Sequence, residues 1–400
     1  MKVGAGQRGL DWHNFFVANV QTGFGPFIAV YLASEAWTQR EIGAALSIGT
    51  VVAMASQLPA GALVDALSNK RLAALAACLA IAASALLLAW MPDPLPVFIA
   101  EILHGLASCM LAPAIAAMSL ALVGRRRFGE RLGRNARYAA IGSGVAAGVM
   151  GAAGTWVSER SVFFLTAALM GPAIAMLALI PAARVRTSIT VTTPRGGLRE
   201  AVRLLLGWRV LVFAACVVLF HLANAAMLPL VAADVTKAVG SRASLIIAAS
   251  IVLPQLLVAA ASPFVGRAAD RWGRRPVLML TFLAVPVRGL LLAAVPPGIP
   301  VALVQVLDGI SAAGFGVLLP LMAADLTAGT NRFNLCMGLF GLAAGLGATV
   351  STALAGSLAD RYGTDFALCV LAAAGLASVL LVLAAVPETR PALVEARAEA

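Results

Sequence analysis

The chain has 400 residues, of which 61% are hydrophobic and only 12% are charged, and its formal net charge is +11. One soluble core cannot bury so much apolar surface, so the composition indicates a chain with many membrane-spanning helices. The positive charges lie in short gaps between apolar runs, which fits orientation in a membrane and excludes a nucleic-acid-binding protein. The 5 cysteines are far apart and show neither metal-ligand nor disulfide spacing, so we expect no metal and no cofactor.

Apolar stretches follow one another along the whole chain, and a spanning helix needs about 20 mostly apolar residues. Twelve candidate spans cover residues 11–33, 41–64, 72–91, 96–123, 136–157, 161–183, 208–233, 243–266, 276–295, 300–324, 334–359 and 364–386. Thr38 and Glu41 have the capping-box spacing that opens a helix. The sequence therefore predicts an all-α integral membrane protein.

The basic residues predict the orientation of these spans. With both termini inside, most arginines and lysines fall in the cytoplasmic segments. The outer segments hold only Arg40, Arg160, Lys237, Arg242 and Arg361. This asymmetry predicts a multi-pass protein with the N-terminus in and the C-terminus in. The N-terminal segment lacks a small-residue cleavage site, so we expect a retained first helix.

The longest inner loop divides the spans into two sets of six. Its Thr, Pro and Gly content is typical of a linker. We expect an N-terminal six-helix bundle at 1–183, a cytoplasmic linker at 184–207, a C-terminal six-helix bundle at 208–387 and a cytoplasmic tail at 388–400. The part of the linker that begins at Leu198 has the pattern of a basic amphipathic helix on the inner membrane surface.

The two halves repeat each other at nearly one offset. "GALVDALSNKR" begins at Gly61 and "GRAADRWGRR" at Gly266, and "FFVAN" at Phe15 matches "FHLAN" at Phe220. "EILHGLAS" at Glu101 likewise matches "QVLDGISA" at Gln305. Matches in register along the chain indicate an internal duplication into two pseudo-symmetric bundles. Two parallel repeats are typical of a transporter that rocks around a central substrate site.

The repeated charged loop resembles the signature loop of the major facilitator superfamily, Gly-x-Leu-x-Asp-Arg-x-Gly-Arg-Lys/Arg. The first copy matches it at Gly61, Leu63, Asp65, Lys70 and Arg71, and departs from it at Ala66 and Ser68. The second copy matches it at Gly266, Asp270, Arg271, Gly273, Arg274 and Arg275. The resemblance implies a loop that latches one conformation; the alternative is that these arginines only set topology.

The signature residues have a physical reason. Glycine permits a close helix crossing, and the aspartate can meet the N-terminus of a neighbouring helix, where anions are favoured. In the fifth span, Gly144, Gly148, Gly151 and Gly154 resemble the glycine-rich motif of the family's antiporter branch, although the usual Gly-Pro pair is missing. The alternative for these glycines is ordinary tight helix packing.

Several ionisable residues lie inside predicted spans, where a charge costs about 2.5 kcal/mol or more. Glu101 and His104 share one face of the fourth span. Such a pair can take up and release a proton near neutral pH; the alternative is a buried hydrogen bond that ties helices together. The family often has an Arg at the position of Glu101, so the role of that Arg does not carry over.

Arg288 and Asp308 lie at similar depth on the ninth and tenth spans. We expect them to form an ion pair, which favours a structural role, with proton coupling by Asp308 as the alternative. Polar residues also lie on spans that line the cavity in the family. The candidates for the cavity are Asn19, Gln21, His221 and Asn224, with Gln57 and Gln255 as weaker ones. Hydrogen bonds between helices are the alternative for each.

These features favour a secondary transporter that works by alternating access, with protons, a small-molecule substrate and the lipid bilayer as its partners. We expect a monomer in the bacterial inner membrane that resembles drug or metabolite:proton antiporters and exports a small organic molecule. A proton-coupled importer or a uniporter of the same fold is the alternative, and a non-transporting membrane sensor is a remote one. No pattern of an intramembrane enzyme is present.

Overall fold

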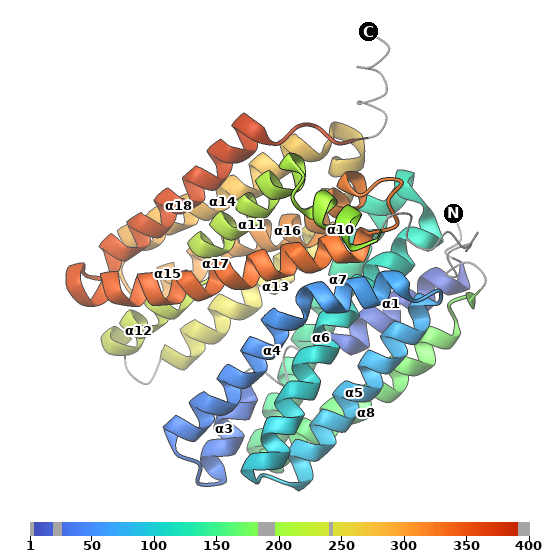
Figure 1. Ribbon diagram of the computed structural model, residues 1–400. Coiled ribbons are helices and arrows are strands. Elements are labelled where there is room, and N and C mark those ends of the chain that lie inside the picture. Colours follow the sequence, from blue (N-terminus) through green and yellow to red (C-terminus); the bar gives the residue numbers. More distant parts are fainter. Residues whose placement is uncertain (1–3, 19–25, 183–196, 240–242, 391–400) are drawn as a thin grey trace. The chain divides into compact units, whose positions relative to one another are not determined.

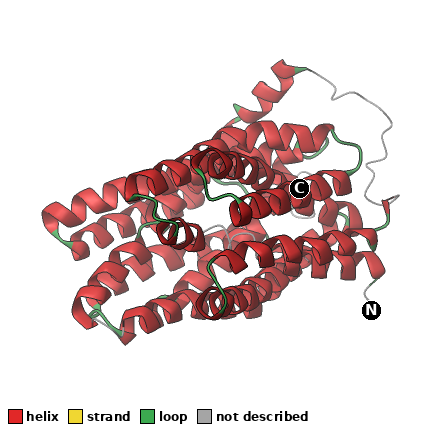
Figure 2. Ribbon diagram, turned by 90° about the horizontal axis from the view of Figure 1, so that it is seen from below, coloured by secondary structure: helices red, strands yellow, loops and turns green. Residues whose placement is uncertain are grey.

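The structure is a computed structural model that describes residues 4–18, 26–182, 197–239 and 243–390. These residues form helices joined by short loops, and no strand occurs among them (Figure 2). The helices of the first half are α1 (Ala5–Val17), α3 (Pro26–Ser34), α4 (Gln39–Ala66), α5 (Lys70–Trp90), α6 (Pro94–Val123), η1 (Arg125–Arg127), α7 (Phe128–Trp156) and α8 (Arg160–Ala178).

The second half continues with further helices (Figure 1). They are α10 (Leu198–Leu205), α11 (Trp208–Asn224), α12 (Met227–Val239), α13 (Ala243–Trp272), α14 (Arg274–Ala294), α15 (Ile299–Val304), α16 (Val306–Leu326), α17 (Phe333–Tyr362) and α18 (Thr364–Ala385). Within the described residues, 10 spans are long and apolar enough to cross a membrane. The helix α7 and the pair α1 and α3 add the remaining two elements of the twelve-helix fold.

The chain divides into two compact units. The first comprises Met1–Arg125, Arg137–Arg195 and Thr330–Gly338, and the second comprises Arg126–Ala136, Gly196–Gly329 and Leu339–Ala400. Each unit therefore consists mainly of one half of the chain and includes a short segment of the other half. Both borrowed segments contain the N-terminal end of a long helix, α17 for the first unit and α7 for the second.

In the first unit, α5 packs against both α6 and α8. The buried face of α5 is lined by small residues, among them Ala73, Ala77 and Ala85. Small side chains let helix backbones approach closely, which is the main source of packing energy between helices in lipid. At the outer end, the Tyr31 hydroxyl donates to the Leu88 carbonyl at 2.9 Å and so ties α3 to α5.

In the second unit, α14 packs against α16 and α18, and α11 also packs against α18. Phe213 of α11 and Phe340 of α17 are buried and lie edge to face with ring centroids 4.9 Å apart. A Cβ added to Gly375 of α18 would lie 3.0 Å from Pro286 Cδ of α14, so the glycine permits that close approach. The unit therefore has its own packed core.

The described helices agree with most of the expected spans, and the differences have physical causes. The capping box of α4 is present: Thr38 N donates to Glu41 Oε2 at 2.9 Å, and Glu41 N donates to Thr38 Oγ1 at 3.3 Å. The helix expected from Leu198 is also present as α10. In contrast, α7 begins at Phe128 rather than at 136, because its polar first turns extend beyond the apolar run from which the span was predicted.

Two expected spans are interrupted. The span predicted at 208–233 is divided into α11 and α12 at Ala225 and Ala226, and the span predicted at 300–324 is divided into α15 and α16 at Gln305. Pro229 lies inside α12, beyond the interruption. The expected first span is α1 followed by α3, and residues 19–25 between them lie outside the described residues.

Candidate functional site

A buried carboxylate lies in the seam between α4 and α6. Glu101 of α6 is only 6% exposed, and its Oε1 has no hydrogen-bond partner among the described residues. Its other oxygen lies against Gly49 of α4, where even a Cβ would overlap it. The helices are close here, since a Cβ added to Gly105 would lie 2.9 Å from the Gly49 carbonyl oxygen. The sequence therefore accommodates Glu101 by placing glycines opposite and beside it.

His104 lies one turn further along α6. Its Nε2 and the Ser108 hydroxyl oxygen are 3.2 Å apart and share a hydrogen bond. No ion pair or hydrogen bond joins Glu101 to His104 in the described part of the chain. The two groups thus share a helix and a region of the first unit, as the spacing implies, but act as separate polar groups.

The second unit contains an ion pair inside its membrane helices. Arg288 of α14 is 2% exposed, and its Nη1 donates to Asp308 Oδ1 of α16. The expected pairing is therefore present. The Asp308 side chain is 31% exposed, so the carboxylate is the accessible end of the pair.

The residues expected to line a cavity fall into three groups. Asn19 and Gln21 lie outside the described residues, and Gln57 and Gln255 are half-buried. His221 and Asn224 are half-buried on the last turn of α11. The His221 ring contacts Phe315 of α16 with centroids 4.7 Å apart, and its Nδ1 bonds to the Val217 carbonyl at 3.1 Å, which leaves Nε2 as the acceptor nitrogen. The Asn224 side-chain oxygen is buried without a hydrogen-bond partner in the described structure.

The first charged loop (residues 61–71) meets the N-terminus of α17. Asp65 Oδ1 accepts hydrogen bonds from Asn334 N at 3.0 Å and Asn334 Nδ2 at 2.7 Å, and Oδ2 accepts one from Leu335 N at 2.8 Å. Gly61 lies so close to the Asn334 carbonyl that a Cβ would overlap it. The Lys70 ammonium donates to the Val64 and Leu67 carbonyls, at 2.5 and 2.7 Å, rather than to an acid.

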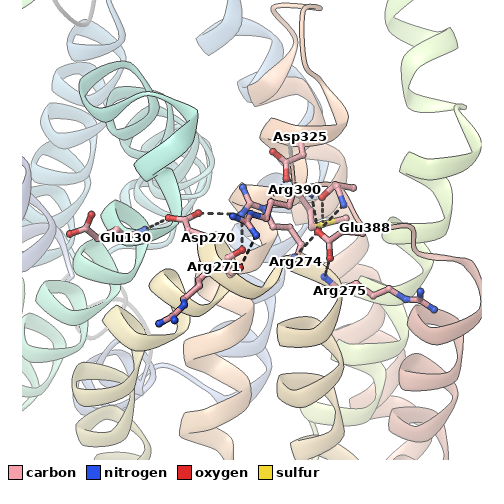
Figure 3. A network of polar contacts seen from close by, with 11 residues as sticks. Glu130, Asp270, Arg271, Arg274, Arg275, Asp325, Glu388 and Arg390 are labelled. Atoms are coloured by element: carbon pink, nitrogen blue, oxygen red, sulfur yellow. Dashed lines mark hydrogen bonds and ion pairs between the residues drawn. The ribbon is translucent and has the colours of Figure 1, made fainter. Parts of the chain in front are cut away.

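The second charged loop (residues 266–275) repeats this contact with α7. Asp270 Oδ2 accepts a hydrogen bond from Glu130 N at 3.0 Å (Figure 3). Gly266 lies against the Gly129 carbonyl as Gly61 lies against that of Asn334. The anion again lies at a helix N-terminus, where the orphan backbone N–H groups and the helix dipole stabilise it. This is the physical reason for glycine and aspartate at that spacing in both loops.

The second loop has additional acids around its arginines (Figure 3). Arg274 donates from Nη1 to Asp270 at 3.2 Å and from Nε to Asp325 at 2.9 Å, and its side chain is only 3% exposed. Glu388 accepts from the backbone N–H groups of Arg274 and Arg275 at 2.8 and 3.1 Å and so caps α14. These contacts connect the loop to the end of the described chain.

The other arginines of the two charged loops take part in hydrogen bonds with backbone carbonyls. Arg71 Nη1 donates to the Ile180 carbonyl at 2.6 Å, and Arg275 Nη2 donates to the Leu383 carbonyl. The backbone carbonyl of Arg271 accepts from Arg390 Nη1 at 2.7 Å. The sequence did not identify Asp325 and Glu388 as partners of the second loop.

The glycines of the fifth span lie on α7. A Cβ added to Gly144 or Gly148 would meet no described atom within 4 Å, whereas at Gly154 it would lie 3.3 Å from Glu159. Gly154 therefore lies close to a described side chain, and the choice between an antiporter motif and ordinary helix packing stays a prediction.

A buried polar group on α1 was not predicted from the sequence. His13 is 0% exposed, its Nδ1 bonds to the Ala173 carbonyl of α8 at 2.8 Å, and its Nε2 has no hydrogen-bond partner among the described residues. Asp11 and Asn14 beside it are also buried. The signal was the run of polar residues in "DWHN" inside an otherwise apolar first span. In the described part of the chain, no group of three or more His, Cys, Asp or Glu side chains could hold a metal ion.

These features define an integral membrane protein with twelve helices in two related halves, each carrying the same charged loop at a helix N-terminus. The sequence profile of the Major Facilitator Superfamily matches residues 13–236 and 213–400. An uncharacterized MFS-type transporter of Mycobacterium tuberculosis is 33% identical over 394 residues, which cover 96% of this chain and 93% of the relative. The chain belongs to the major facilitator superfamily, and it is a multi-pass membrane transporter.

Solved structures share the fold. The proton:xylose symporter XylE, bound to 6-bromo-6-deoxy-D-glucose, superposes with a TM-score of 0.73 at 15% identity, over 96% of both chains. The human organic anion transporter MFSD10 (TETRAN) superposes with a TM-score of 0.72 at 12% identity, over 94% of this chain and 99% of that one. Members of this family are transporters rather than enzymes, and they handle small molecules within the membrane.

Proposed function

We propose that this transporter is a proton-coupled antiporter that exports a small organic molecule. The observation that carries the proposal is the carboxylate of Glu101, which lies in a membrane helix, is 6% exposed and has one oxygen without a partner among the described residues. A charge in that position costs about 2.5 kcal/mol or more, so the buried group favours its protonated form. Exposure to water removes that cost and releases the proton.

Alternating access supplies the two environments. In the proposed cycle the cargo binds from the inside, the outward-facing state releases it, and a proton from the outside neutralises Glu101. The neutral carboxyl then returns through the closed state. His104 and Ser108, one and two turns along α6 from Glu101, provide a polar group and a hydroxyl by which the proton reaches Glu101.

One coupling site supplies enough free energy. A proton that moves down about 100 mV releases about 2.3 kcal/mol, and each unit of pH gradient adds about 1.4 kcal/mol. Together these sustain an approximately 500-fold cargo gradient. The export direction is supported by a partial similarity: a Multidrug resistance protein B homolog of Mycobacterium tuberculosis is 32% identical over 142 residues, which cover 35% of this chain.

In this proposal, polar groups on the membrane helices select the substrate. Among the described candidates, His221 and Asn224 offer acceptor atoms on α11. The free carboxylate of Glu101 favours a cationic or neutral cargo over an anion. The protein would act as a monomer in a bacterial inner membrane, in line with its mycobacterial relatives.

We also propose that the two charged loops are latches that hold one conformation of the cycle. Asp65 and Asp270 each bind the N-terminus of a helix whose residues belong to both units. Breaking these contacts is a necessary step in any motion that separates the helix ends from the loops. Charges that only set topology would not require the carboxylates to bind there.

The coupling proposal is tested with inside-out vesicles. An accumulation screen in a deletion strain, across antibiotics, siderophores, sugars and amino acids, first identifies a cargo. Addition of that cargo to energised vesicles should then collapse the proton gradient, which a pH-sensitive dye reports. Glu101→Gln should abolish this proton movement, and Glu101→Gln with His104→Ala should do no more.

Asp93→Asn is the matched control, because Asp93 is an exposed acid at the start of the same helix and its side chain makes no capping hydrogen bond. It should leave proton movement unchanged. Unaltered proton-driven transport in Glu101→Gln would refute the coupling site. Cargo uptake with the proton gradient, rather than against it, would assign an importer, and cargo flux that ignores the gradient would assign a uniporter.

A further inference from the structure

The interruption between α11 and α12 is supported by side chains from other helices. Together these two helices form one membrane span, Trp208–Val239. Because an interrupted helix leaves backbone groups without intrahelical partners, they must find others in a membrane. Ala226 N donates to the Ser351 hydroxyl oxygen of α17 at 3.1 Å, and the Asn224 carbonyl accepts from Arg288 Nη2 of α14 at 3.3 Å.

Arg288 lies between the last residue of α11 and the first residue of α12. Besides the Asn224 carbonyl, it contacts the Met227 sulfur from Nε at 3.4 Å and from Nη2 at 3.2 Å. The neighbouring Gly289 permits this approach, because a Cβ there would lie 2.8 Å from Met227 Cε. One guanidinium thus touches both sides of the interruption.

Asp308 supplies the opposite charge. It binds Arg288 Nη1 from α16, and its side chain is 31% exposed whereas that of Arg288 is 2% exposed. Removing the counter-charge leaves a buried cation unpaired, which proteins do not tolerate without rearrangement. The position of the guanidinium at the interruption therefore depends on the accessible carboxylate.

The described residues of the first half lack this arrangement. In the repeat, Ser84 stands where the second half has Arg288 and His104 stands where it has Asp308. The Ser84 hydroxyl instead donates to the Ala100 carbonyl at 2.7 Å. Among the described residues, the ion pair therefore occurs in one half only. A pair that merely filled a helix interface common to both halves would be expected in both.

We propose that Arg288 is a positioning residue that holds the interruption between α11 and α12, with Asp308 as its counter-ion, so that α12 is a lever released when the pair opens. The last turn of α11 carries His221 and Asn224, which the proposed function assigns to the cargo. The link between this lever and the cargo therefore rests on the proposed function. The structural role of Arg288 at the interruption does not.

The lever is tested by hydrogen–deuterium exchange of the full-length protein in lipid nanodiscs, without cargo or gradient. Arg288→Met with Asp308→Leu removes both charges and leaves neither unpaired. Peptides from residues 227–235 should exchange at least about tenfold faster than in the wild type, as expected for the loss of a charge-assisted hydrogen bond. Peptides from α14 and α16 should be unchanged.

Arg288→Lys provides a second variant that keeps the charge. A single ammonium can bind Asp308 but cannot also reach both sides of the interruption, so α12 should still exchange faster although the pair is intact. Arg160→Gln with Glu35→Gln is the control, since it removes an exposed ion pair of the first unit and should not affect α12. Wild-type exchange of α12 in either test variant, or a uniform rise across the second unit, would show that the pair only stabilises the fold. Neither result bears on proton coupling by Glu101.

Discussion

The two charged loops have the same geometry, but they differ in the charged side chains around them. Lys70 and Arg274 are each the first residue of the helix that follows the loop. Both donate to the carbonyl that precedes the aspartate, that of Val64 in the first loop and that of Ala269 in the second. The shared contact shows that the duplicated loop requires a donor there and that either cation can provide it.

The cations differ in what else they reach. The Lys70 ammonium donates to backbone carbonyls, whereas the Arg274 guanidinium also binds Asp270 and Asp325. Arginine has five donors in a fixed planar fork, so it can serve a carbonyl and two carboxylates at once. In the repeat, Ala121 stands where the second half has Asp325. The first loop therefore lacks the counterpart of Asp325 at that position.

The caps of the following helices differ in the same way. Asn69 Oδ1 accepts from Arg71 N at 3.1 Å and caps α5 locally. The equivalent residue before α14 is Gly273, with φ +108, and the cap is Glu388 from the end of the described chain. One loop is therefore complete in itself, and the other depends on residues far away in the sequence. This difference predicts unequal responses to matched substitutions.

Replacement of the two cations should give the largest difference. Arg274→Met removes the guanidinium from Asp325, whose side chain is 5% exposed, and should cost about 3–5 kcal/mol of stability. Lys70→Met removes hydrogen bonds to carbonyls only and should cost about 1–3 kcal/mol. The apparent melting temperature of the purified protein in detergent measures both. Equal losses of stability in the two variants would mean that the acids around Arg274 contribute nothing to stability.

The aspartates should have the next largest effect, on conformation more than on stability. Cys336 is buried on the first turn of α17, beside the residues that bind Asp65. If the loops are latches, Asp65→Ala and Asp270→Ala should each increase labelling of Cys336 by a membrane-impermeant maleimide in inside-out vesicles, by about tenfold for the loss of a charge-assisted bond. Cys369, which is exposed, is first replaced by Ser.

Ser68→Gly is the control for the aspartates, because it restores the family's glycine in the first loop without touching a hydrogen bond described there. It should change labelling less than Asp270→Ala does. Negligible effects of all three substitutions on labelling and on transport would refute the latch, and would leave the arginines as topology signals.

The caps should differ by a smaller amount. Glu388→Gln keeps the size of the side chain but removes the charge that binds the backbone N–H groups of Arg274 and Arg275. It should cost about 1 kcal/mol, as should Asn69→Ala at the first cap. Glu388→Gln should also slow transport if the tail steadies the second loop, whereas Asn69→Ala should not. A transport defect of the same size in both variants would contradict this difference.

The sequence predicted the parts of this comparison that are local or repeated. Glycine and aspartate at a fixed spacing imply a close helix crossing with an anion at a helix N-terminus, and the contacts of Asp65 and Asp270 have that form. The pairing of Arg288 with Asp308 followed from their equal depth in the membrane. The capping box at Thr38 followed from spacing alone.

The parts that depend on tertiary structure were not predictable. Nothing near the second loop indicates that Glu388, more than one hundred residues away, caps α14. The interruption after Asn224 was missed because the residues that satisfy its backbone, Arg288 and Ser351, come from other helices. His13 was missed because the polar run "DWHN" does not reveal whether a carbonyl of another helix lies within reach of the imidazole.

The smallest effect is expected when a glutamate equivalent to Glu388, the cap of α14, is introduced into the first half. "IPAAR" at Ile180 matches "VPETR" at Val386, so Ala182 stands where the second half has Glu388. Ala182→Glu should change the apparent stability by less than about 0.5 kcal/mol, because Asn69 already caps α5 and surface changes of this kind are nearly neutral. In an Asn69→Gly background, however, the same substitution should recover stability, since the local cap is then absent. Thermal unfolding of the single and double variants measures this coupling. If Ala182→Glu has no effect on stability in either background, a glutamate at position 182 cannot cap α5 as Glu388 caps α14. The sequence match between "IPAAR" and "VPETR" would then not correspond to equivalent positions in the two halves.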